Sequence, residues 1–246
     1  MAKAPSKRKR PSREDFMLKE QRKIESEVFD RPTLLVLARM LKKGIFSSLD
    51  FPISTGKEAN VFRASIEEGK YLAVKVYKIE TAAFFRRKEY LEGDPRFSRI
   101  KPQSKEWVYA FAQKEFKNLR ICEQANVHAP QPVYWEKNIV VMEFLGEGGL
   151  PYQTMNIVHP RSEKDLKSVL EDIRRMYKAG LVHADISEYN LLLGDVPYFI
   201  DWGQGVVTRH PNAERFLARD VENVLKYFGK FGYKREPQDV LEWIKG

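Results

Sequence analysis

Two acidic residues and one asparagine, set at fixed spacings, constrain this chain more than any other feature. Asp185 and Asn190 lie in the stretch 183–190 (HADISEYN), and Asp201 follows Asn190 by eleven residues. Phosphoryl transfer needs a carboxylate beside the attacking hydroxyl and oxygen ligands that hold magnesium on the phosphates. These three side chains supply both, so the region predicts a phosphoryl-transfer centre.

A β-hairpin is predicted between Asn190 and Asp201. Short apolar runs at 191–193 and 198–200 flank a GDVP turn sequence. If the turn is centred near residues 195 and 196, Asn190 and Asp201 become cross-strand neighbours with Cβ atoms about 5 Å apart, close enough to hold one hard cation. The alternative is an ordinary surface hairpin with incidental acids.

Length and composition place the chain among intracellular globular proteins. Its 246 residues, 43% of them hydrophobic, can bury one large core or two small lobes. The single cysteine, Cys122, excludes an intramolecular disulfide and favours a reducing compartment. The sequence starts without an apolar signal core and has no run long enough to cross a bilayer, so we expect a soluble, cytoplasmic protein without a membrane partner.

The formal net charge of +9 is concentrated in two segments. Residues 1–13 carry six basic and no acidic side chains, and residues 81–105 carry seven basic against three acidic ones. Clustered Lys and Arg on flexible segments commonly contact phosphate backbones, which indicates an RNA-associated partner. For the tail alone, a role in solubility explains the charge equally well.

The first half of the chain changes from a helical pattern to a strand pattern. After the basic tail 1–13, expected to be disordered, a helical extension is predicted over 14–50, with Asp30 as an N-cap and Gly44 at a helix end. Strand patterns then predict a five-stranded antiparallel sheet, interrupted by a flexible charged loop at 79–105 and a helix. The strands centre on Ile53, 61–62, 71–77, 133–135 and 139–144, and the helix on 107–123.

The second half is mostly helical and starts after glycines within 146–151. Helices are predicted at 162–180, 213–228 and 237–244. A sheet-rich half, a connector and a helix-rich half that carries the acidic motif form the order of an α+β, protein-kinase-like bilobal fold. We therefore expect an N-lobe at 51–145 and a C-lobe at 146–246.

A phosphate-binding loop is predicted between the first two strands, where kinases place a glycine-rich loop. The loop has one glycine and does not fit the Walker pattern, which counts against a P-loop NTPase. A plain hairpin turn is the alternative. Its residues are Ser54, Thr55, Gly56, Lys57, Glu58, Ala59, Asn60 and Val61.

An ion pair is predicted behind that loop. Lys75 lies in an apolar strand and needs a counter-charge, because an unpaired ammonium in a partly dry cleft costs several kcal/mol, roughly. Glu115 in the following helix is the natural partner. Met142, Glu143 and Leu145 would form the adenine-facing linker, with the Glu143 carbonyl and the Leu145 amide hydrogen-bonded to the base.

Together, the loop 54–61 (STGKEANV), the stretch 183–190 and Asp201 resemble the RIO atypical protein kinases, and the type-1 branch fits best. Residues 78–85 are similar to that branch's flexible loop, and the segment before the sheet is too short for the winged helix of the type-2 branch. The resemblance spans about residues 30–246.

The resemblance implies a set of roles. Asp185 would be the catalytic base, Asn190 and Asp201 ligands of Mg²⁺ or Mn²⁺, and Lys75 the phosphate-binding lysine. Asp201 would also accept phosphate as an aspartyl-phosphate. Implied activities are serine autophosphorylation, ATP hydrolysis and maturation of the small ribosomal subunit, with its precursor RNA and proteins as partners. Further nucleotide contacts implied by the resemblance are Glu115, Pro151 and Glu188.

Other classes remain open. Only 45 residues follow Asp201, no Ala-Pro-Glu sequence occurs, and residues 202–204 (WGQ) replace the usual Phe-Gly, so we expect neither an activation segment nor substrate-binding subdomains. This favours a restricted substrate or an ATPase-gated factor that binds and leaves a pre-ribosomal particle. A small-molecule kinase of the aminoglycoside or choline type shares the Asp-x4-Asn loop, but commonly has His-Pro-Gly where this chain has 187–189 (SEY).

Overall fold

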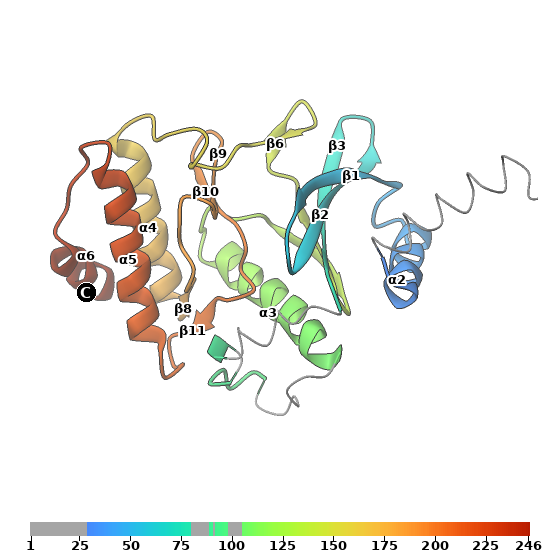
Figure 1. Cartoon of the computed structure of the whole chain (residues 1–246), viewed down its shortest axis with the longest axis horizontal. Coiled ribbons are helices and arrows are strands. Elements are labelled where there is room, and N and C mark those ends of the chain that lie inside the picture. The colour runs from blue at the N-terminus through green and yellow to red at the C-terminus, as the bar shows by residue number, and fades with distance from the viewer. Residues whose placement is uncertain (1–28, 80–88, 91, 98–104) are drawn as a thin grey trace, which may run out of the picture.

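The computed structural model describes residues 29–79, 89–90, 92–97 and 105–246. The basic tail, the helix expected before residue 29 and most of the loop 79–105 lie outside the described residues. Figure 1 shows two halves, a sheet with α2 (Arg31–Lys42) on one side and a group of helices on the other. Helix α3 (Lys105–Gln124) lies between them.

The sheet half contains the predicted five strands, all antiparallel, in the order β1-β2-β3-β5-β4. Strand β3 is central and buried from its third residue onward, as its run of apolar residues requires. The bounds are β1 Ser48–Thr55, β2 Ala59–Glu67, β3 Lys70–Tyr77, β4 Pro132–Glu136 and β5 Ile139–Glu143.

Helix α2 begins and ends where its sequence predicts. The Asp30 carboxylate accepts a hydrogen bond from the Thr33 N–H at 2.8 Å, which satisfies one of the free amides at the helix start. Gly44, with φ of 71°, lies just beyond its end. The buried face of α2 carries Val36 and Met40 and packs in one apolar cluster with residues of β2, β3 and β5.

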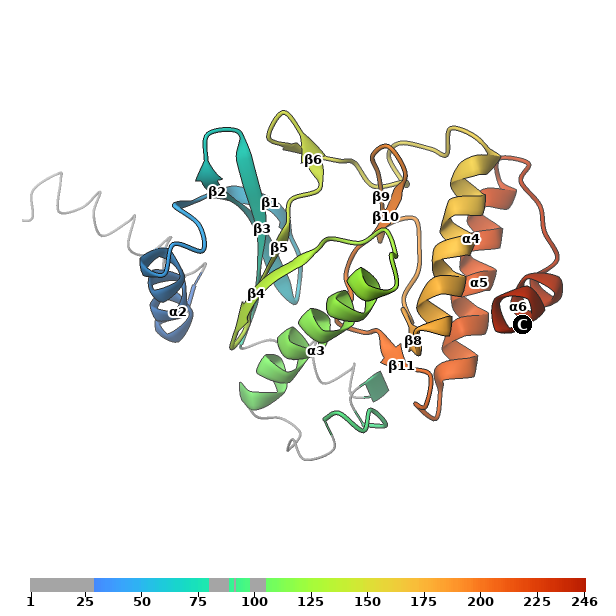
Figure 2. The ribbon, with the colours of Figure 1, turned by 180° about the vertical axis from the view of Figure 1, so that it is seen from behind.

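The helical half consists of α4 (Glu163–Lys178), α5 (Ala213–Gly229) and α6 (Pro237–Lys245), which pack side by side (Figure 2). Ser162 caps α4 by accepting from the Lys164 N–H at 3.3 Å. A single large apolar cluster joins the inner faces of α4 and α5 to α3 and to β3 and β5. The two halves therefore share one core.

Three short two-stranded sheets complete the fold, namely β6 (Gly146–Glu147) with β7 (Leu150–Pro151), β9 (Leu191–Leu193) with β10 (Pro197–Phe199), and β8 (Leu181–Val182) with β11 (Val206–Val207). Sequence patterns did not predict the β8–β11 pair. This pair brings together the start of the stretch 183–190 and the end of the segment after Asp201.

The predicted hairpin forms, but its expected register is wrong by one residue. Leu193 pairs with Pro197, and the Asn190 carbonyl accepts from the Ile200 N–H at 3.0 Å, so Asn190 faces Ile200 instead of Asp201. The turn has three residues, 194–196, and Arg161 donates to the carbonyls of its first two. A one-residue slip reverses the faces of a strand.

The described part of the loop 79–105 packs on the helical half. Tyr90 and Phe97 are buried, and the Tyr90 ring stacks on Phe216 of α5 with centroids 5.1 Å apart. The Glu89 carbonyl lies 3.0 Å from a His210 ring nitrogen. Across the described ranges, no helix is both long and apolar enough to cross a membrane.

Candidate functional site

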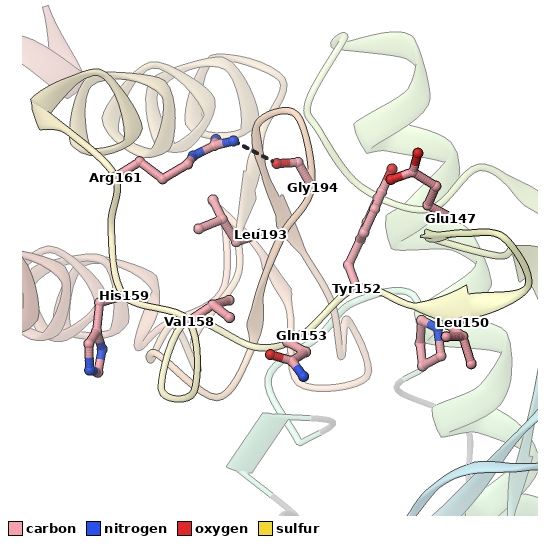
Figure 3. A pocket seen from close by; sticks show the side chains of 10 residues that line it. Glu147, Leu150, Tyr152, Gln153, Val158, His159, Arg161, Leu193 and Gly194 are labelled. Carbon is pink, nitrogen blue, oxygen red and sulfur yellow. Dashed lines mark hydrogen bonds between the residues drawn. The ribbon is translucent and has the colours of Figure 1, made fainter.

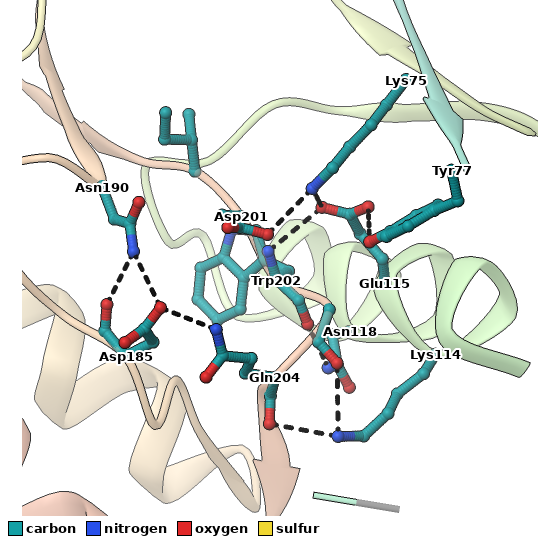
Figure 4. A network of polar contacts seen from close by, with 12 residues as sticks. Lys75, Tyr77, Lys114, Glu115, Asn118, Asp185, Asn190, Asp201, Trp202 and Gln204 are labelled. Carbon is teal, nitrogen blue, oxygen red and sulfur yellow. Dashed lines mark hydrogen bonds and ion pairs between the residues drawn. The ribbon is translucent and has the colours of Figure 1, made fainter. Parts of the chain in front are cut away.

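The site is centred on Lys75, which projects from β3 and is 8% exposed. Its ammonium lies 2.6 Å from Glu115 Oε1 on α3 and 2.9 Å from Asp201 Oδ1 beyond β10 (Figure 4). The expected ion pair with Glu115 is therefore present, and Asp201 shares the same cation. Three elements that are distant in sequence meet at one charge.

The charges of this cluster stabilise one another. Burial alone would lower the pKa of Lys75, but the carboxylates of Asp201 and Glu115 outweigh burial and raise that pKa well above its ordinary value. Lys75 is therefore a cation at neutral pH, held between two carboxylates.

Glu115 has two further partners, which sequence reasoning missed. The Tyr77 hydroxyl donates to its Oε2 at 2.6 Å, and the Trp202 N–H donates to its Oε1 at 3.2 Å. Burial, and then the charge of Glu115, raise the pKa of Tyr77 well above its ordinary value, so Tyr77 stays a donor. Tyr77 lies two residues after Lys75 on β3, and this i, i+2 spacing on one strand face is the signal that would have found it.

Helix α3 also holds the backbone of the segment after Asp201. Asn118 donates to the carbonyls of Trp202 and Gly205, both at 2.8 Å. Lys114 donates to the carbonyls of Gly203 and Gln204, at 3.4 and 3.1 Å. Lys114 has no exposed surface, and burial lowers its pKa to about 7.

The loop before Asp185 is held in an uncommon conformation. Ala184 has φ of 66°, a left-handed backbone that costs a residue with a Cβ about 1 kcal/mol. Asp220 on α5 accepts from the N–H groups of Ala184 and Ile186, at 2.7 and 3.0 Å, and Arg219 donates to the Ala184 carbonyl. Burial raises the pKa of Asp220 to about 7 against the effect of these N–H groups.

Asp201 itself has φ of 65°, so it leaves the extended conformation directly after the hairpin. This turn brings its carboxylate to Lys75, which the predicted strand pairing did not anticipate. The preceding Ile200 carbonyl lies 3.0 Å from His183 Nε2, and burial lowers the pKa of His183 to about 4. His183 is therefore a neutral structural group at neutral pH.

Asp185 is contacted by two amide side chains. Asn190 Nδ2 lies 2.8 Å from its carbonyl oxygen and 3.2 Å from its Oδ2, and Gln204 Nε2 lies 2.7 Å from the same Oδ2. In Figure 4 the Asn190 amide nitrogen faces Asp185, and its oxygen points away. The Asn190 oxygen and the Asp201 carboxylate are hard oxygen donors of the kind that Mg²⁺ prefers, so the donor set fits that ion.

Within the described ranges, no group of three or more His, Cys, Asp and Glu side chains could hold a metal ion. Two protein ligands with substrate phosphates are the usual arrangement for Mg²⁺, so the pair formed by Asn190 and Asp201 needs no third protein ligand.

The predicted phosphate loop is a tight connection between β1 and β2. The Gly56 N–H donates to the Ala59 carbonyl at 2.9 Å, and a Cβ on Gly56 would lie 3.1 Å from that oxygen. Lys78 donates from its side chain to the Gly56 carbonyl at 2.6 Å and from its backbone to the Glu58 carbonyl at 2.8 Å.

The predicted adenine linker begins in the last two residues of β5 and ends just beyond the strand. Met142 and Leu145 are buried, Glu143 is exposed, and the Leu145 carbonyl accepts from the Tyr152 N–H at 3.0 Å. Pro151 lines a separate cavity of about 400 Å³ beside the β9–β10 turn, shown in Figure 3. None of the side chains around Lys75 lines that cavity.

Glu188 contacts residues outside the cluster formed by Lys75, Glu115 and Asp201. Its carboxylate lies 3.4 Å from the Lys230 ammonium, and its carbonyl accepts from the Asn156 N–H at 3.0 Å. The structure thus brings Lys75, Glu115 and Asp201 into direct contact and joins Asp185 to Asn190, while Glu188 and Pro151 contact other groups.

Sequence comparison places these residues in a known family. Residues 60–240 match the RIO domain. A Haloferax volcanii protein named RIO-type serine/threonine-protein kinase Rio1 is 38% identical over 231 residues, covering 92% of this chain and 79% of that relative. A Thermoplasma acidophilum protein of the same name is 40% identical over 185 residues, covering 75% of this chain and 98% of the relative.

Structure comparison agrees on the fold. Rio2 kinase from Chaetomium thermophilum has a TM-score of 0.63, and the same kinase in an ADP/Mg²⁺-phosphoaspartate complex has 0.61. Both are 22% identical and cover 83% of this chain, which spans 65% and 63% of those chains respectively. The bilobal, kinase-like α+β fold predicted from the sequence is confirmed.

Proposed function

This chain belongs to the RIO family of atypical serine/threonine protein kinases, of the RIO1 type, and we propose that it transfers the γ-phosphate of Mg·ATP to a serine hydroxyl, including one of its own. The observation that carries this proposal is the sharing of the Lys75 ammonium by Glu115 and Asp201. It fixes a cation where the phosphates of a nucleotide need one.

Each residue has a role in the proposed reaction. Asp185 accepts the proton of the attacking hydroxyl, and Lys75 orients the α- and β-phosphates while Glu115 holds Lys75 in place. Asn190 and Asp201 would hold Mg²⁺, with Mn²⁺ as an alternative, and the ion supplies positive charge to the phosphate oxygens when bound. The loop 54–61 and the linker at 142–145 are proposed to hold the phosphates and the adenine.

A second candidate is an ATPase-gated binding factor, and the short connection after the site favours it. Only residues 208–212 separate β11 from α5, which leaves little chain to bind a peptide substrate. In this reading Asp201 takes the phosphate as an aspartyl-phosphate that water then hydrolyses. A small ribosomal subunit precursor as the partner, and a cytoplasmic location, stay predictions.

Incubation of the purified protein with radiolabelled ATP and Mg²⁺ tests the proposal. We expect label on a serine of the protein, and we expect Asp185→Asn to reduce labelling by about 10²- to 10⁴-fold, the usual contribution of a general base. ATP binding, measured by calorimetry, should survive in that variant. Wild-type labelling by Asp185→Asn would refute the assignment.

The chemistry of the label separates the alternatives. Acid-stable label indicates phosphoserine, whereas hydroxylamine-labile label that turns over to free phosphate indicates the aspartyl-phosphate route. Label only on an added alcohol would support a small-molecule kinase instead. If the binding-factor reading holds, Asp185→Ala should also remain on small-subunit precursors during sedimentation.

A further inference from the structure

We propose that Gln204 is a positioning residue for Asp185, an inference that rests on the proposed role of Asp185 as the base. Gln204 lies three residues after Asp201 and is 3% exposed. Its Nε2 donates to Asp185 Oδ2 at 2.7 Å, a shorter distance than the 3.2 Å from Asn190 Nδ2 to the same oxygen (Figure 4).

A carboxylate needs this kind of support, because its last torsion is soft. Rotation about the terminal sp³–sp² bond of Asp has broad minima, so one hydrogen bond leaves the plane of the group poorly defined. Asn190 also donates to Oδ2, at 3.2 Å. Two amides on one oxygen fix the orientation of the carboxylate and, as donors to an ionised acceptor, make stronger bonds than neutral pairs.

Gln204 can orient the Asp185 carboxylate because hydrogen bonds from α3 hold the backbone around Gln204 in place. Lys114 donates to the Gln204 carbonyl at 3.1 Å, and Asn118 holds the carbonyls on either side of the Gly203–Gln204 pair. Both donors lie on α3, next to Glu115. A single rigid element therefore fixes the lysine partner Glu115 and, through Gln204, the orientation of Asp185.

The side-chain amides of Asn190 and Gln204 differ in their other proposed roles. Asn190 is proposed to give its oxygen to the metal, so its grip on Asp185 depends on metal occupancy. Gln204 is not proposed to bind the metal, and it holds Asp185 in this structure. We infer that Gln204 keeps the base aligned before the nucleotide and its metal arrive.

Two substitutions remove the hydrogen-bond donor of Gln204 while keeping the size of its side chain. Gln204→Met has similar length and no donor, and Gln204→Glu keeps the shape but replaces the donor by a carboxylate. Gln238→Met on the exposed face of α6 is the matched control. For each variant we would measure the turnover number for ATP, the dissociation constant of Mg·ATP and the thermal midpoint.

We expect Gln204→Met to lower the turnover number about 10- to 100-fold, the scale of loss for a misplaced catalytic group, without changing nucleotide affinity. Gln204→Glu keeps the size of the side chain but replaces the Nε2 donor by an acceptor, so it should lower the turnover number by a similar factor, again without changing nucleotide affinity. Arg219 and Asp220 of α5, whose charges act on Asp185, are unchanged in both variants.

The outcomes are distinct. Turnover within twofold of wild type in Gln204→Met or in Gln204→Glu overturns the inference, and so does a loss of turnover that is matched by a loss of Mg·ATP affinity. If Gln204→Met does not fold, the isosteric Gln204→Glu decides through its turnover number and its dissociation constant for Mg·ATP. Should Asp185→Asn keep full activity, the proposed function fails first; if it is inactive while both Gln204 variants behave as wild type, only this inference fails.

Discussion

Gly203 occupies a position that admits no side chain. A Cβ there would lie 2.7 Å from the Tyr77 hydroxyl, and that hydroxyl donates to Glu115 at 2.6 Å. The glycine is therefore required by packing, since any larger residue must displace the group that braces Glu115. Its φ lies outside the left-handed region, so backbone strain is not the reason.

We predict that Gly203→Ala lowers phosphorylation activity about tenfold or more, because the displaced Tyr77 loosens Glu115 and thereby Lys75. Gly229→Ala is the matched control, since a Cβ on Gly229 meets nothing within 4 Å at the end of α5. Activity assays and thermal unfolding of both variants check this. Equal activity of Gly203→Ala and wild type would show that Tyr77 moves aside without consequence.

Sequence reasoning found the residues whose spacing is set by chemistry, but not those that support them. Lys75 and Glu115 were paired because a buried cation needs a counter-charge, and the structure pairs them. Gln204, Lys114 and Asp220 support the site from other elements, through contacts that depend on how helices and loops pack. A single sequence carries no periodic signal for such contacts.

Among the elements, α3 combines an apolar face with a polar edge. Trp107, Phe111 and Leu119 lie in the shared core, whereas Lys114 and Asn118 hold backbone carbonyls of the segment after Asp201. Burying Lys114 has a cost that depends on pH. Burial lowers its pKa to about 7, and the charges of Asp94 and Arg96 act on it in opposite directions.

The lowered pKa of Lys114 makes the free energy of unfolding depend on pH. Between pH 7 and the ordinary value of 10.5, the unfolded chain holds a proton on Lys114 that the folded chain lacks, so the free energy of unfolding rises with pH. Each pH unit in this window adds up to about 1.4 kcal/mol. We predict that Lys114→Met removes this rise, as measured by urea unfolding at pH 7 and pH 9.

Lys117→Met provides the control, because Lys117 is exposed on the same helix and its substitution should leave the rise in place. The difference between the two pH values isolates Lys114, since all other titrating groups are common to both proteins. An identical pH dependence in Lys114→Met and wild type would contradict a neutral buried Lys114.

The helix ends followed sequence signals closely, whereas the pairing of the short strands in the helical half did not. Asp30, Gly44 and Ser162 marked helix ends as predicted, because caps are local chemistry. The register of the β9–β10 hairpin was wrong by one residue, because the turn is held by Arg161 from a distant segment. The β8–β11 pair was missed, since two-residue strands leave no pattern.

At the scale of the whole molecule, the described residues form two apolar clusters with different tasks. The larger one extends from β3 through α3 to α4 and α5 and underlies the site. The smaller one lies between α2 and the opposite face of the sheet, and its members include Met40, which has no exposed surface. Helix α2, the described helix of the expected extension, therefore packs behind the sheet and away from Lys75's acidic partners.

We predict that Met40→Ala reduces the free energy of unfolding by about 2–5 kcal/mol, the range for truncating a buried side chain, without changing activity at a temperature where the variant is folded. Leu41→Ala, on the exposed side of the same helix, should change stability much less. Denaturant unfolding and activity assays on both variants test this. A loss of activity in folded Met40→Ala would mean that α2 is coupled to the site.

The hydrogen bonds between α3 and the segment after Asp201 have a consequence for inhibitor design. A compound that needs Trp202 to leave its fully buried place must break two hydrogen bonds, from the Asn118 amide to the Trp202 carbonyl and from the Trp202 N–H to Glu115, each worth about 1 kcal/mol. It must also expose an indole, which costs about 3–5 kcal/mol. Such compounds would lose most of their binding free energy to this rearrangement. Ligands that leave Trp202 in place, and that offer an acceptor to Lys75, are the better chemical starting point.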